Sequence, residues 1–468
     1  MSENNKVFLP KTTFASFKNN NSEDYYIGLW EKAETFNNNT TSKQFILHDG
    51  PPYANGNIHI GHALNKILKD FVVRSKMQQG YNVNFIPGWD CHGLPIEWEV
   101  EKQYLKNNLN KKDVPVLQFR QECREFAQKW QSIQQEQFKN LGINANWNSI
   151  YTTMTNKSEA GIVTEIHKFL MNDGLYRDVK PVMWSTVEKT ALAEAEVEYK
   201  ELESTSAYIK FPVKYCNDPQ FNDVSVIIWT TTPWTIPCNS AIAYGNFEYC
   251  LVETIVNGKL IIAVNLLDDF IAKHPQEYKV LTTITPEQLS KVICHHPLYM
   301  VGYNFDVKLY FGEFVTAETG TGFVHIAPAH GDDDYKFAKK YNLSIPELVD
   351  EEGKFNITTP VFANKFIFKR NGKFGEANSA VLEELQKAQN LVSTSVFKHS
   401  YPHSWRSKLP IIYRATSQWF ISMNTNNLKE KALNKINEVN WGLEKYKNRI
   451  TSMIKDRPDW CISRQRTW

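Results

Sequence analysis

Hydrophobic positions between residues 45 and 86 alternate between short continuous runs and helical spacing. Residues 45–47 form an apolar run that predicts a short strand, and a glycine and two prolines then predict a loop. The next apolar residues recur three and four positions apart, which is typical of one face of a helix, at positions 64, 67, 68, 71 and 72. Gly80 ends this pattern, and residues 83–86 predict a second strand. The order strand, loop, helix, strand is typical of a parallel α/β sheet.

Two further helical patterns follow, one from Pro115 to near Gly142 and one over about 158–174. Alternating and β-branched runs then replace helical spacing between about 205 and 330, at 207–213, 224–232, 249–256 and 259–264. The pair Asn257-Gly258 between two such runs predicts a hairpin. Near residue 395 the chain returns to α/β character, with a strand-like run at 409–414 and a helix-like run at 428–439.

This change of pattern predicts a β-rich module inserted into an α/β domain. Four ranges describe the expected organisation: an arm at 1–44, the first part of a Rossmann-like catalytic domain at 45–195, an inserted domain at 196–394, and the start of the second catalytic part at 395–468. The first 40 or so residues are polar and asparagine-rich, and we expect them to lie on the surface as an arm.

Composition narrows the class of protein. The 468 residues, at roughly 150 per domain, suggest about three structural units. The 53 basic and 51 acidic residues leave a net charge of +2, so a basic surface for a polyanion must come from local arrangement. Seven cysteines contain no Cys-x-x-Cys pair, which argues against a disulfide framework and a four-cysteine zinc site. We find no leader-like start and no apolar run long enough for a membrane span, and we expect a cytoplasmic protein without membrane contact.

The loop after the first predicted strand carries candidate chemistry. It contains Gly50, Pro51 and Gly56, and it leads through His59 into a helix that begins at about Gly61. At the carboxyl end of a strand, a helix N-terminus presents free N–H groups and a positive dipole to a phosphate. His59 and His62 would then stabilise charge that develops on an α-phosphate. For two isolated histidines, a helix N-terminal pair without a ligand would be the more common interpretation.

The surrounding residues change that interpretation. The runs 51–62, 87–97 and 191–199 resemble class I aminoacyl-tRNA synthetases, and in particular the isoleucine-specific members, and the resemblance continues to Trp468. It implies ATP, with Mg²⁺, as a substrate bound at Gly56, His59, Gly61 and His62, the two histidines being catalytic.

The resemblance also implies an amino-acid site. Asp90 would bind the α-ammonium group, Gly50 and Pro51 would form a backbone wall, and two aromatic walls would come from Trp419 and Trp460. A branched hydrocarbon side chain suits such a pocket. Without the resemblance, both tryptophans would be interpreted as core residues.

A second site is a chemical expectation of this activity. An apolar pocket rejects a side chain one methylene smaller by only about 1–3 kcal/mol, a limit for which the family's isoleucine-specific members are the standard example. Valine would be misactivated, and the β-rich module is the candidate site for its hydrolytic removal. By the resemblance, Asp334 would bind the ammonium group of valine, and His325 would contact the substrate or the terminal ribose. The residues that exclude isoleucine and position water would be Thr230, Thr231 and Thr232, and Asn239 would also belong to this editing site. A plain β-strand is the alternative for the threonines.

Some residues depart from the family pattern. Residues 184–189 lack the cysteines that many relatives carry, so we expect no zinc site, and Cys294-His295-His296 is interpreted as a surface or packing cluster. No Lys-Met-Ser-Lys-Ser sequence occurs. In the family that loop grips the ATP triphosphate, so we expect an N-terminal portion of the enzyme that is inactive alone in aminoacylation.

Several functions remain open at this point. The first is an isoleucine-specific tRNA ligase with valine editing, whose partners are tRNA(Ile), isoleucine and ATP and which we expect to be a monomer. A stand-alone valyl-tRNA deacylase and a non-catalytic fragment are alternatives. Valine- and leucine-specific synthetases are alternatives for the substrate, although residues 89–95 favour isoleucine.

Overall fold

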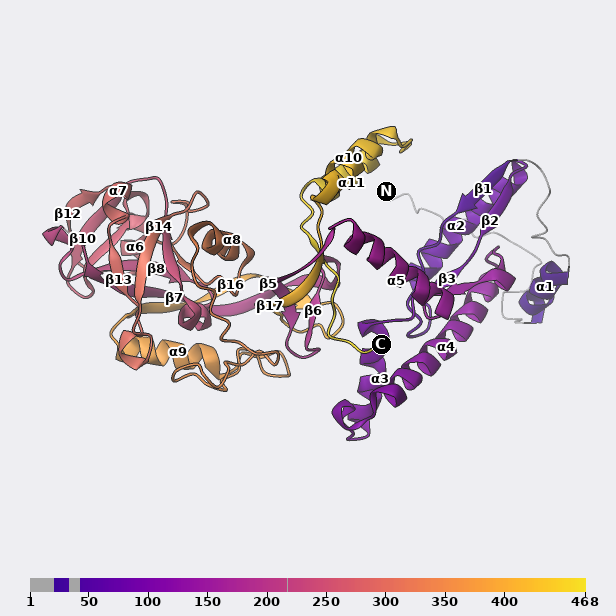
Figure 1. Cartoon of the computed structure of the whole chain (residues 1–468), viewed down its shortest axis with the longest axis horizontal. Helices are drawn as coiled ribbons and strands as arrows, with labels where there is room; N and C mark the ends of the chain where they lie inside the picture. The colour runs from indigo at the N-terminus through magenta and orange to yellow at the C-terminus, as the bar shows by residue number, and fades with distance from the viewer. Residues whose placement is uncertain (1–20, 33–42, 217) are drawn as a thin grey trace, which may run out of the picture. The chain divides into compact units, whose positions relative to one another are not determined.

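A computed structural model describes residues 21–32, 43–216 and 218–468. The chain divides into two compact units, an N-terminal unit of residues 1–167 with 466–468 and a β-rich unit of residues 168–465. Most of the expected arm at 1–44 lies outside the described residues, apart from helix α1 (Asn21–Lys32). Figure 1 shows the helices and strands of each unit.

The N-terminal unit begins with the predicted strand–helix–strand order. Strand β1 (Gln44–Leu47) pairs in parallel with β2 (Asn82–Phe85), and helix α2 (Ile60–Gln78) connects them. The parallel pairing confirms the α/β character expected for this segment. A second parallel pair joins β3 (Gly88–Trp89) to β4 (Tyr151–Thr152). Its remaining helices are α3 (Leu94–Lys106), α4 (Val116–Asn140) and α5 (Asn156–Met171), the last of which crosses the boundary between the units.

Helix α2 does not bury the face that its apolar residues define. Leu64, Leu68 and Phe71 are 60%, 53% and 62% exposed among the described residues. The helix instead buries Lys66, Asp70 and Val73, two of which are charged. Apolar spacing therefore predicted the helix correctly, but burial follows the partners that the fold supplies.

The β-rich unit is built around a ten-stranded sheet. Its strands run in the order β12-β10-β11-β8-β7-β13-β14-β9-β15, and β16 pairs with β7 outside that path. The long antiparallel pair joins β7 (Val197–Tyr215) to β16 (Leu391–Ser404). The other bounds are β8 (Val224–Thr230), β9 (Ala241–Tyr244), β10 (Tyr249–Thr254), β11 (Gly258–Ala263), β12 (Tyr278–Ile284), β13 (Ile293–His295), β14 (Asp306–Phe311) and β15 (Phe323–Ile326).

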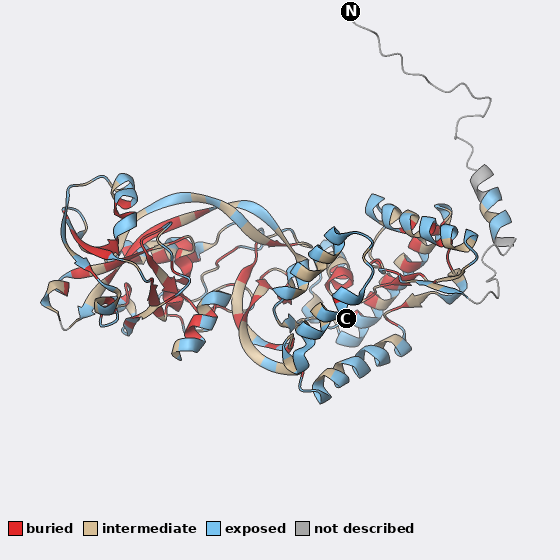
Figure 2. Cartoon of the chain, turned by 90° about the horizontal axis from the view of Figure 1, so that it is seen from above, coloured by how far each residue is buried: buried red, intermediate tan, exposed pale blue. Residues whose placement is uncertain are grey.

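The predicted hairpin is present, because β10 and β11 pair antiparallel with Thr254 opposite Gly258. Gly258 has a φ of +73°, a conformation that favours glycine. Helices of this unit include α6 (Leu267–Lys273), α7 (Pro286–Leu289), α8 (Asp332–Tyr341) and α9 (Glu376–Lys387). Buried residues gather on the strands of this sheet in Figure 2.

A smaller four-stranded sheet belongs to the same unit, in the order β18-β17-β5-β6. Its strands are β5 (Leu175–Ser185), β6 (Thr190–Leu192), β17 (Ile412–Ile421) and β18 (Trp460–Cys461). Helices α10 (Leu428–Glu438) and α11 (Glu444–Lys455) pack together, and the first of them confirms the helix expected at 428–439. The strand expected at 409–414 lies further along the chain than predicted.

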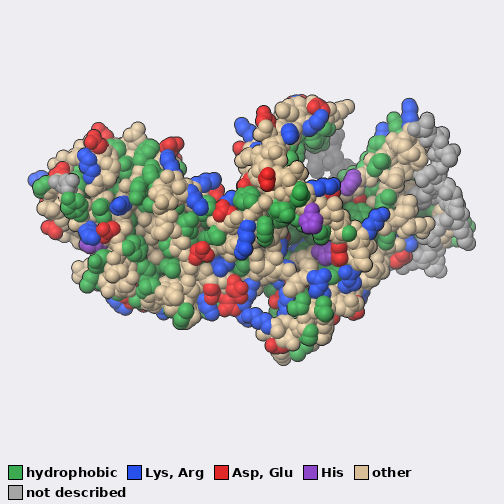
Figure 3. Space-filling model, in the orientation of Figure 1, with side chains coloured by type: hydrophobic (Ala, Val, Ile, Leu, Met, Phe, Trp, Pro, Cys, Tyr) green, Lys and Arg blue, Asp and Glu red, His purple; other side chains and the backbone are tan. Residues whose placement is uncertain are grey.

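Surface charge agrees with the balanced composition. Basic and acidic side chains are interspersed over the face shown in Figure 3. Among the described residues, helices are too short or too polar to cross a membrane.

Candidate functional site

The first candidate site lies where the loop after β1 enters α2. His59 is the N-cap of α2, and its Nδ1 accepts a hydrogen bond of 3.0 Å from the Gly61 N–H. The His59 N–H in turn donates to Nδ1 of His62 at 3.3 Å, and the two rings stack with centroids 3.9 Å apart. Because both Nδ1 atoms accept, each neutral ring carries its proton on Nε2.

The start of α2 depends on the lack of a side chain at Gly61 and on the protonation state of His62. A Cβ atom at Gly61 would lie only 2.9 Å from Cε1 of His59, so glycine is what allows the ring to cap the helix. Burial lowers the pKa of His62, and the charges of His59 and Lys66 lower it further. His62 is therefore a neutral donor beside the positive end of the helix.

Asp90 follows β3 and lies against the same loop. The Asp90 N–H donates to the Pro52 carbonyl at 2.9 Å, and the Ala54 N–H donates to the Asp90 carbonyl at 3.0 Å. Burial raises the pKa of Asp90, and hydrogen bonds from the His92 backbone and the Thr153 side chain oppose that rise. Backbone pairing thus places Asp90 beside Pro52 and Ala54, which follow Gly50 and Pro51 in the same loop.

The two tryptophans expected at the amino-acid site belong to the β-rich unit. Trp419 lies on β17 and Trp460 on β18, and they are 44% and 48% exposed. The pairing of Ile421 with Trp460 places both indoles on one face of the small sheet, as diagonal neighbours. Neither tryptophan is a core residue, in contrast to the interpretation from residue type alone.

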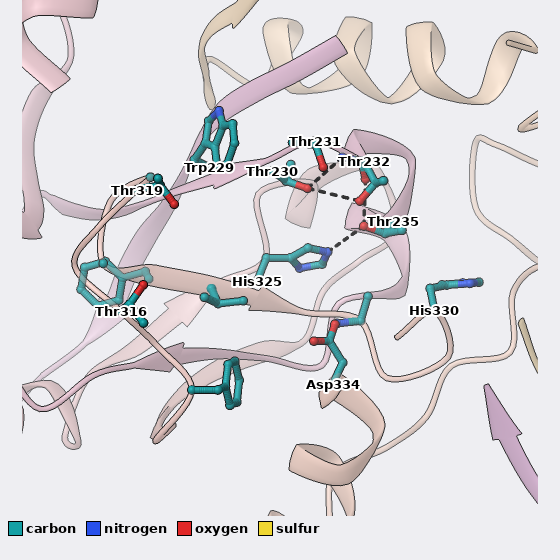
Figure 4. Close-up of a pocket in the computed structure, with 16 residues that line it drawn as sticks. Trp229, Thr230, Thr231, Thr232, Thr235, Thr316, Thr319, His325, His330 and Asp334 are labelled. Carbon is teal, nitrogen blue, oxygen red and sulfur yellow. Dashed lines mark hydrogen bonds between the residues drawn. The ribbon is translucent and has the colours of Figure 1, made fainter. Parts of the chain in front are cut away.

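A cavity of about 320 Å³ lies inside the β-rich unit (Figure 4). Two separate stretches of the sequence line it: the end of β8 with the residues after it, and residues 314–334, which include the loop before β15, β15 itself and the first turn of α8. The lining comprises Trp229, Thr230, Thr231, Thr232, Thr235, Phe314, Thr316, Thr319, Gly320, Gly322, Phe323, Val324, His325, Ala327, His330 and Asp334.

The threonine segment reaches this cavity because β8 ends at Thr230. Pro233 lacks a backbone N–H and begins a short 3₁₀ helix (Pro233–Cys238), so the strand cannot continue. The turn is held by local hydrogen bonds: the Thr232 N–H donates to the Thr230 hydroxyl at 3.1 Å, and the Thr235 hydroxyl donates to the Thr232 carbonyl at 2.8 Å. Thr230 is thus the last residue of the strand, whereas Thr231 and Thr232 lie beyond it, and all three line the cavity.

His325 forms a buried part of the cavity wall. Its Nδ1 accepts from the Asn239 amide at 2.7 Å, and its Nε2 pairs with the Thr235 hydroxyl at 3.0 Å. Burial, with the neighbouring His296 and His330, lowers the pKa of His325 to about 3. The imidazole is therefore neutral at physiological pH. Asn239 lies behind it and is not itself a lining residue.

Asp334 supplies the acidic group of the cavity. It lies in the first turn of α8, and its Oδ2 accepts a hydrogen bond of 2.8 Å from the Ala327 N–H. Burial raises its pKa to about 6; the bond from Ala327 opposes the rise, and the charge of Asp333 adds to it. At pH 7 the carboxylate is ionised in a confined space, and it would attract an ammonium group.

The lining combines this carboxylate with threonine hydroxyls and few other charges. His330 also has a pKa lowered by burial, to about 4, and it bonds to the Tyr413 carbonyl at 2.8 Å. The cavity can thus bind a cationic amine at one end and orient a water molecule with hydroxyls.

In the described ranges, no cluster of three or more histidine, cysteine or carboxylate side chains could hold a metal ion. The Cys294-His295-His296 sequence contributes to packing, as expected. Cys294 and His296 are buried, and the His296 ring stacks on Tyr303 with centroids 5.0 Å apart.

Comparison with known proteins identifies the family. A family model described as tRNA synthetases class I (I, L, M and V) matches residues 26–468. The chain belongs to this family. Within the family, its curated relatives include the isoleucine–tRNA ligase of Pelagibacter ubique (strain HTCC1062), which is 46% identical over 480 residues, covering 100% of this chain and 52% of that protein.

Two other isoleucine–tRNA ligases are similarly related. That of Gluconobacter oxydans (strain 621H) is 48% identical over 91% of this chain and 46% of its own length. That of Agrobacterium fabrum (strain C58 / ATCC 33970) is 45% identical over 94% of this chain and 48% of its own length. The chain spans about half the length of the curated relatives it matches. Membership of the class I family and similarity to isoleucine–tRNA ligases agree with the resemblance in the sequence.

Sequence reasoning did not select every residue that the structure places at the cavity. Trp229 and Thr235 lie close to Thr230, Thr231 and Thr232 in the sequence, and that proximity was the available signal. Thr316 and Phe314 carry no recognisable signal, because they reach the cavity through a loop whose position depends on β14 and β15.

Proposed function

We propose that this chain supplies amino-acid activation and editing modules of an isoleucine–tRNA ligase. In this proposal a Rossmann-like catalytic domain, formed by residues 45–195 and 395–468, is interrupted by an editing domain at 196–394. The similarity to isoleucine–tRNA ligases supports the substrate assignment. Isoleucine, ATP with Mg²⁺ and tRNA(Ile) are the substrates, in a monomeric enzyme of the cytoplasm.

The observation that carries the proposal is the cavity that Asp334 lines together with Thr230, Thr231 and Thr232. In the proposed reaction, the Asp334 carboxylate binds the ammonium group of a valyl ester at the 3′ end of tRNA. Hydroxyls of Thr230, Thr231 and Thr232 limit the space for a longer side chain and orient water. Water attacks the ester carbonyl, the bond to the ribose oxygen breaks, and that oxygen takes a proton. Valine and free tRNA are the products.

For activation, the N-terminal unit would bind ATP at the start of α2. The N–H groups of α2, together with His59, Gly61 and His62, would contact the α-phosphate, with Gly56 in the preceding loop. The amino acid would be held by Asp90 through its ammonium group, and the other contacts would come from Gly50, Pro51, Trp419 and Trp460. The isoleucine carboxylate then attacks the α-phosphorus of ATP, and pyrophosphate leaves.

Deacylation of valyl-tRNA(Ile) by the 468-residue chain tests the editing assignment. We expect hydrolysis, and we expect Asp334→Ala to abolish it because the ammonium loses its partner. Asp333→Ala is the matched control, because that side chain lies in the same helical turn but is 81% exposed. If Asp334→Ala hydrolyses valyl-tRNA(Ile) at the rate of the unmodified chain, the editing site is wrongly assigned.

Isoleucine-dependent ATP–pyrophosphate exchange tests the chain's activation activity. We expect no robust exchange from these 468 residues, because the sequence contains no Lys-Met-Ser-Lys-Ser loop. Hydrolysis of valyl-tRNA(Ile) without exchange would favour the stand-alone deacylase as the activity of this chain. Robust exchange would contradict our expectation.

A further inference from the structure

One buried carboxylate in the N-terminal unit has no part in the proposed reactions. Asp49 directly precedes Gly50, and its side chain is completely enclosed. It accepts hydrogen bonds from Nζ of Lys66 at 2.5 Å, Nζ of Lys69 at 2.6 Å and the Gly88 N–H at 3.1 Å. The carboxylate therefore joins three separate segments of the chain.

Each of these segments carries a residue of the proposed activation site. Asp49 is the neighbour of Gly50 in the loop after β1. Lys66 and Lys69 lie three residues apart on one face of α2, and Lys66 follows His62 by one turn. Gly88 opens the strand that ends next to Asp90.

Aromatic side chains enclose Lys66 and the Gly88 backbone, two of the groups that contact Asp49. Nζ of Lys66 lies 5.3 Å from the ring centroid of Phe138 and 5.8 Å from that of Phe85, and Lys66 is 3% exposed. A Cβ atom at Gly88 would lie 2.1 Å from the Tyr151 ring, so the backbone there is tightly enclosed. The N–H that Asp49 accepts thus comes from a fixed position.

Stability does not by itself explain such a group. Burying an ion pair costs desolvation energy that its attraction often fails to recover, and an apolar cluster of similar volume is commonly at least as stable. A buried carboxylate with defined acceptor directions can, however, set the distances among three segments more narrowly than apolar contacts do.

We propose that Asp49 is a positioning residue, which fixes the start of α2 relative to the Gly50–Pro51 wall and to Asp90 so that one adenylate can contact all three. This inference rests on the proposed function of the N-terminal unit. Asp49 touches no substrate in it; it acts through Lys66, Lys69 and the Gly88 backbone.

The test compares Asp49→Asn with Asp70→Asn in the full 468-residue chain. Asparagine keeps the size of Asp49, but it removes the charge and directs an N–H group at a neighbouring donor. Asp70 is a matched control on the same helix: it is 8% exposed, and it accepts from Nε of Arg74 at 2.6 Å and from the Asn144 N–H at 2.7 Å, away from the site residues.

The first readout is the affinity for a non-hydrolysable isoleucyl-adenylate analogue, measured by calorimetry well below the unfolding temperature of both variants. We expect Asp49→Asn to weaken binding about 10- to 100-fold, because a small misplacement of the binding groups is enough for such a loss. The affinity of Asp70→Asn for the analogue should lie within about twofold of that of the unmodified chain, even if Asp70→Asn loses as much stability as Asp49→Asn. Equal effects of the two variants, or no effect of Asp49→Asn, would overturn the proposal.

The second readout, amide hydrogen exchange followed by mass spectrometry, needs no ligand. Asp49→Asn should speed exchange in residues 54–62 and 86–92, whereas Asp70→Asn should speed it near residues 142–146. Unchanged exchange at 86–92 in Asp49→Asn would overturn the proposal. If the unmodified chain fails to bind the analogue, the proposed activation site is wrong. Hydrogen exchange would in that case still decide whether Asp49 holds the three segments together.

Lys69→Met provides a milder variant if Asp49→Asn does not fold. The Lys69 side chain is 16% exposed, and its loss leaves the Asp49–Lys66 pair intact. We expect faster exchange at 54–62 and weaker analogue binding, in the same direction as for Asp49→Asn. If neither property changes in Lys69→Met, the proposal is wrong.

Discussion

The amide nitrogen of Asn239 donates a hydrogen bond of 2.7 Å to Nδ1 of His325. The same nitrogen also donates to the Ala241 carbonyl at 2.9 Å, which fixes the orientation of the amide. Nδ1 of His325 must therefore accept, and the ring proton lies on Nε2, where it donates to the Thr235 hydroxyl. Both nitrogens are used within the protein, so His325 contributes a neutral, fixed wall to the cavity instead of a proton acceptor.

This arrangement predicts that His325 does not titrate in the physiological range. Its pKa is lowered to about 3, mainly by burial, so the ring should remain neutral from pH 5 to pH 8. Long-range ¹H–¹⁵N correlation spectra should show one Nε2–H tautomer throughout, with the signal assigned by its loss in His325→Gln. A protonation midpoint above pH 5, or an Nδ1–H tautomer, would contradict the hydrogen-bond assignment.

Asp334 should make the protein less stable as pH rises through its titration range. Its pKa is raised to about 6, so the unfolded chain ionises this carboxyl first, and stability falls between about pH 4 and pH 6. Asp334→Asn removes this penalty, and we expect it to raise the free energy of unfolding at pH 7.5 by about 2–3 kcal/mol. Thermal and denaturant unfolding at several pH values would measure the difference.

The pH dependence is what identifies the carboxyl as the cause. The difference between Asp334→Asn and the unmodified chain should shrink towards pH 4, where the native carboxyl is protonated. Asp333→Asn is the control, because its side chain is 81% exposed and should change stability little at either pH. A stability difference of constant size from pH 4 to pH 7.5 would show that the raised pKa is not its source.

Glu97 should prove important for holding the segment 466–468 within the N-terminal unit. One of its oxygens accepts from the backbone N–H groups of Thr467 and Trp468 at 2.8 and 2.9 Å, and the other pairs with Lys111 and Arg466, both at 3.2 Å. Its side chain is fully buried. We expect Glu97→Ala to cost about 3–5 kcal/mol of stability, because buried cations and donors lose their partner.

The environment of Trp468 reports on this contact separately. Its indole N–H donates to the Cys91 carbonyl at 2.7 Å, and the residue is 7% exposed. Acrylamide quenching of tryptophan fluorescence should rise in Glu97→Ala, and the added component should vanish when Trp468 is also replaced by Phe. Glu101→Gln is the control: it also pairs with Arg466, but its side chain is 25% exposed. Equal costs for both variants would argue against a special role of Glu97.

Two glycines that line the cavity should respond differently to substitution. Gly320 and Gly322 have φ values of +84° and +82°, so alanine meets the same backbone strain of about 1–2 kcal/mol at each. A Cβ atom at Gly322 would also lie 2.5 Å from the Cβ of Ala263, whereas at Gly320 the nearest atom is 3.6 Å away in Trp229. We expect Gly322→Ala to cost about 1–3 kcal/mol more than Gly320→Ala.

Denaturant unfolding of the two variants would measure this difference directly, since the shared backbone strain cancels. Equal stabilities would mean that the strand carrying Ala263 moves away without cost. A larger loss of stability in Gly320→Ala would contradict the closer packing of Gly322 against Ala263.

The local parts of the fold could be predicted from the sequence, because they depend on neighbouring residues. Apolar spacing predicted α2, and Asn257-Gly258 predicted the hairpin of β10 and β11. Spacing did not predict what each element buries: Leu64 and Phe71 are exposed, whereas Lys66 on the same helix is enclosed by Asp49 and two phenylalanines. The partners that decide burial come from other segments.

The same division holds for the candidate sites. The sequence alone pointed to Asp334, His325 and the threonine run, because these residues stand in recognisable motifs. Only the tertiary structure brought them around one cavity, raised the pKa of Asp334 by burial and directed both nitrogens of His325 into the protein. Motifs reflect residue identity and order along the chain. Enclosure, protonation and hydrogen-bond direction depend on segments about 100 residues apart in sequence that meet only in the folded chain.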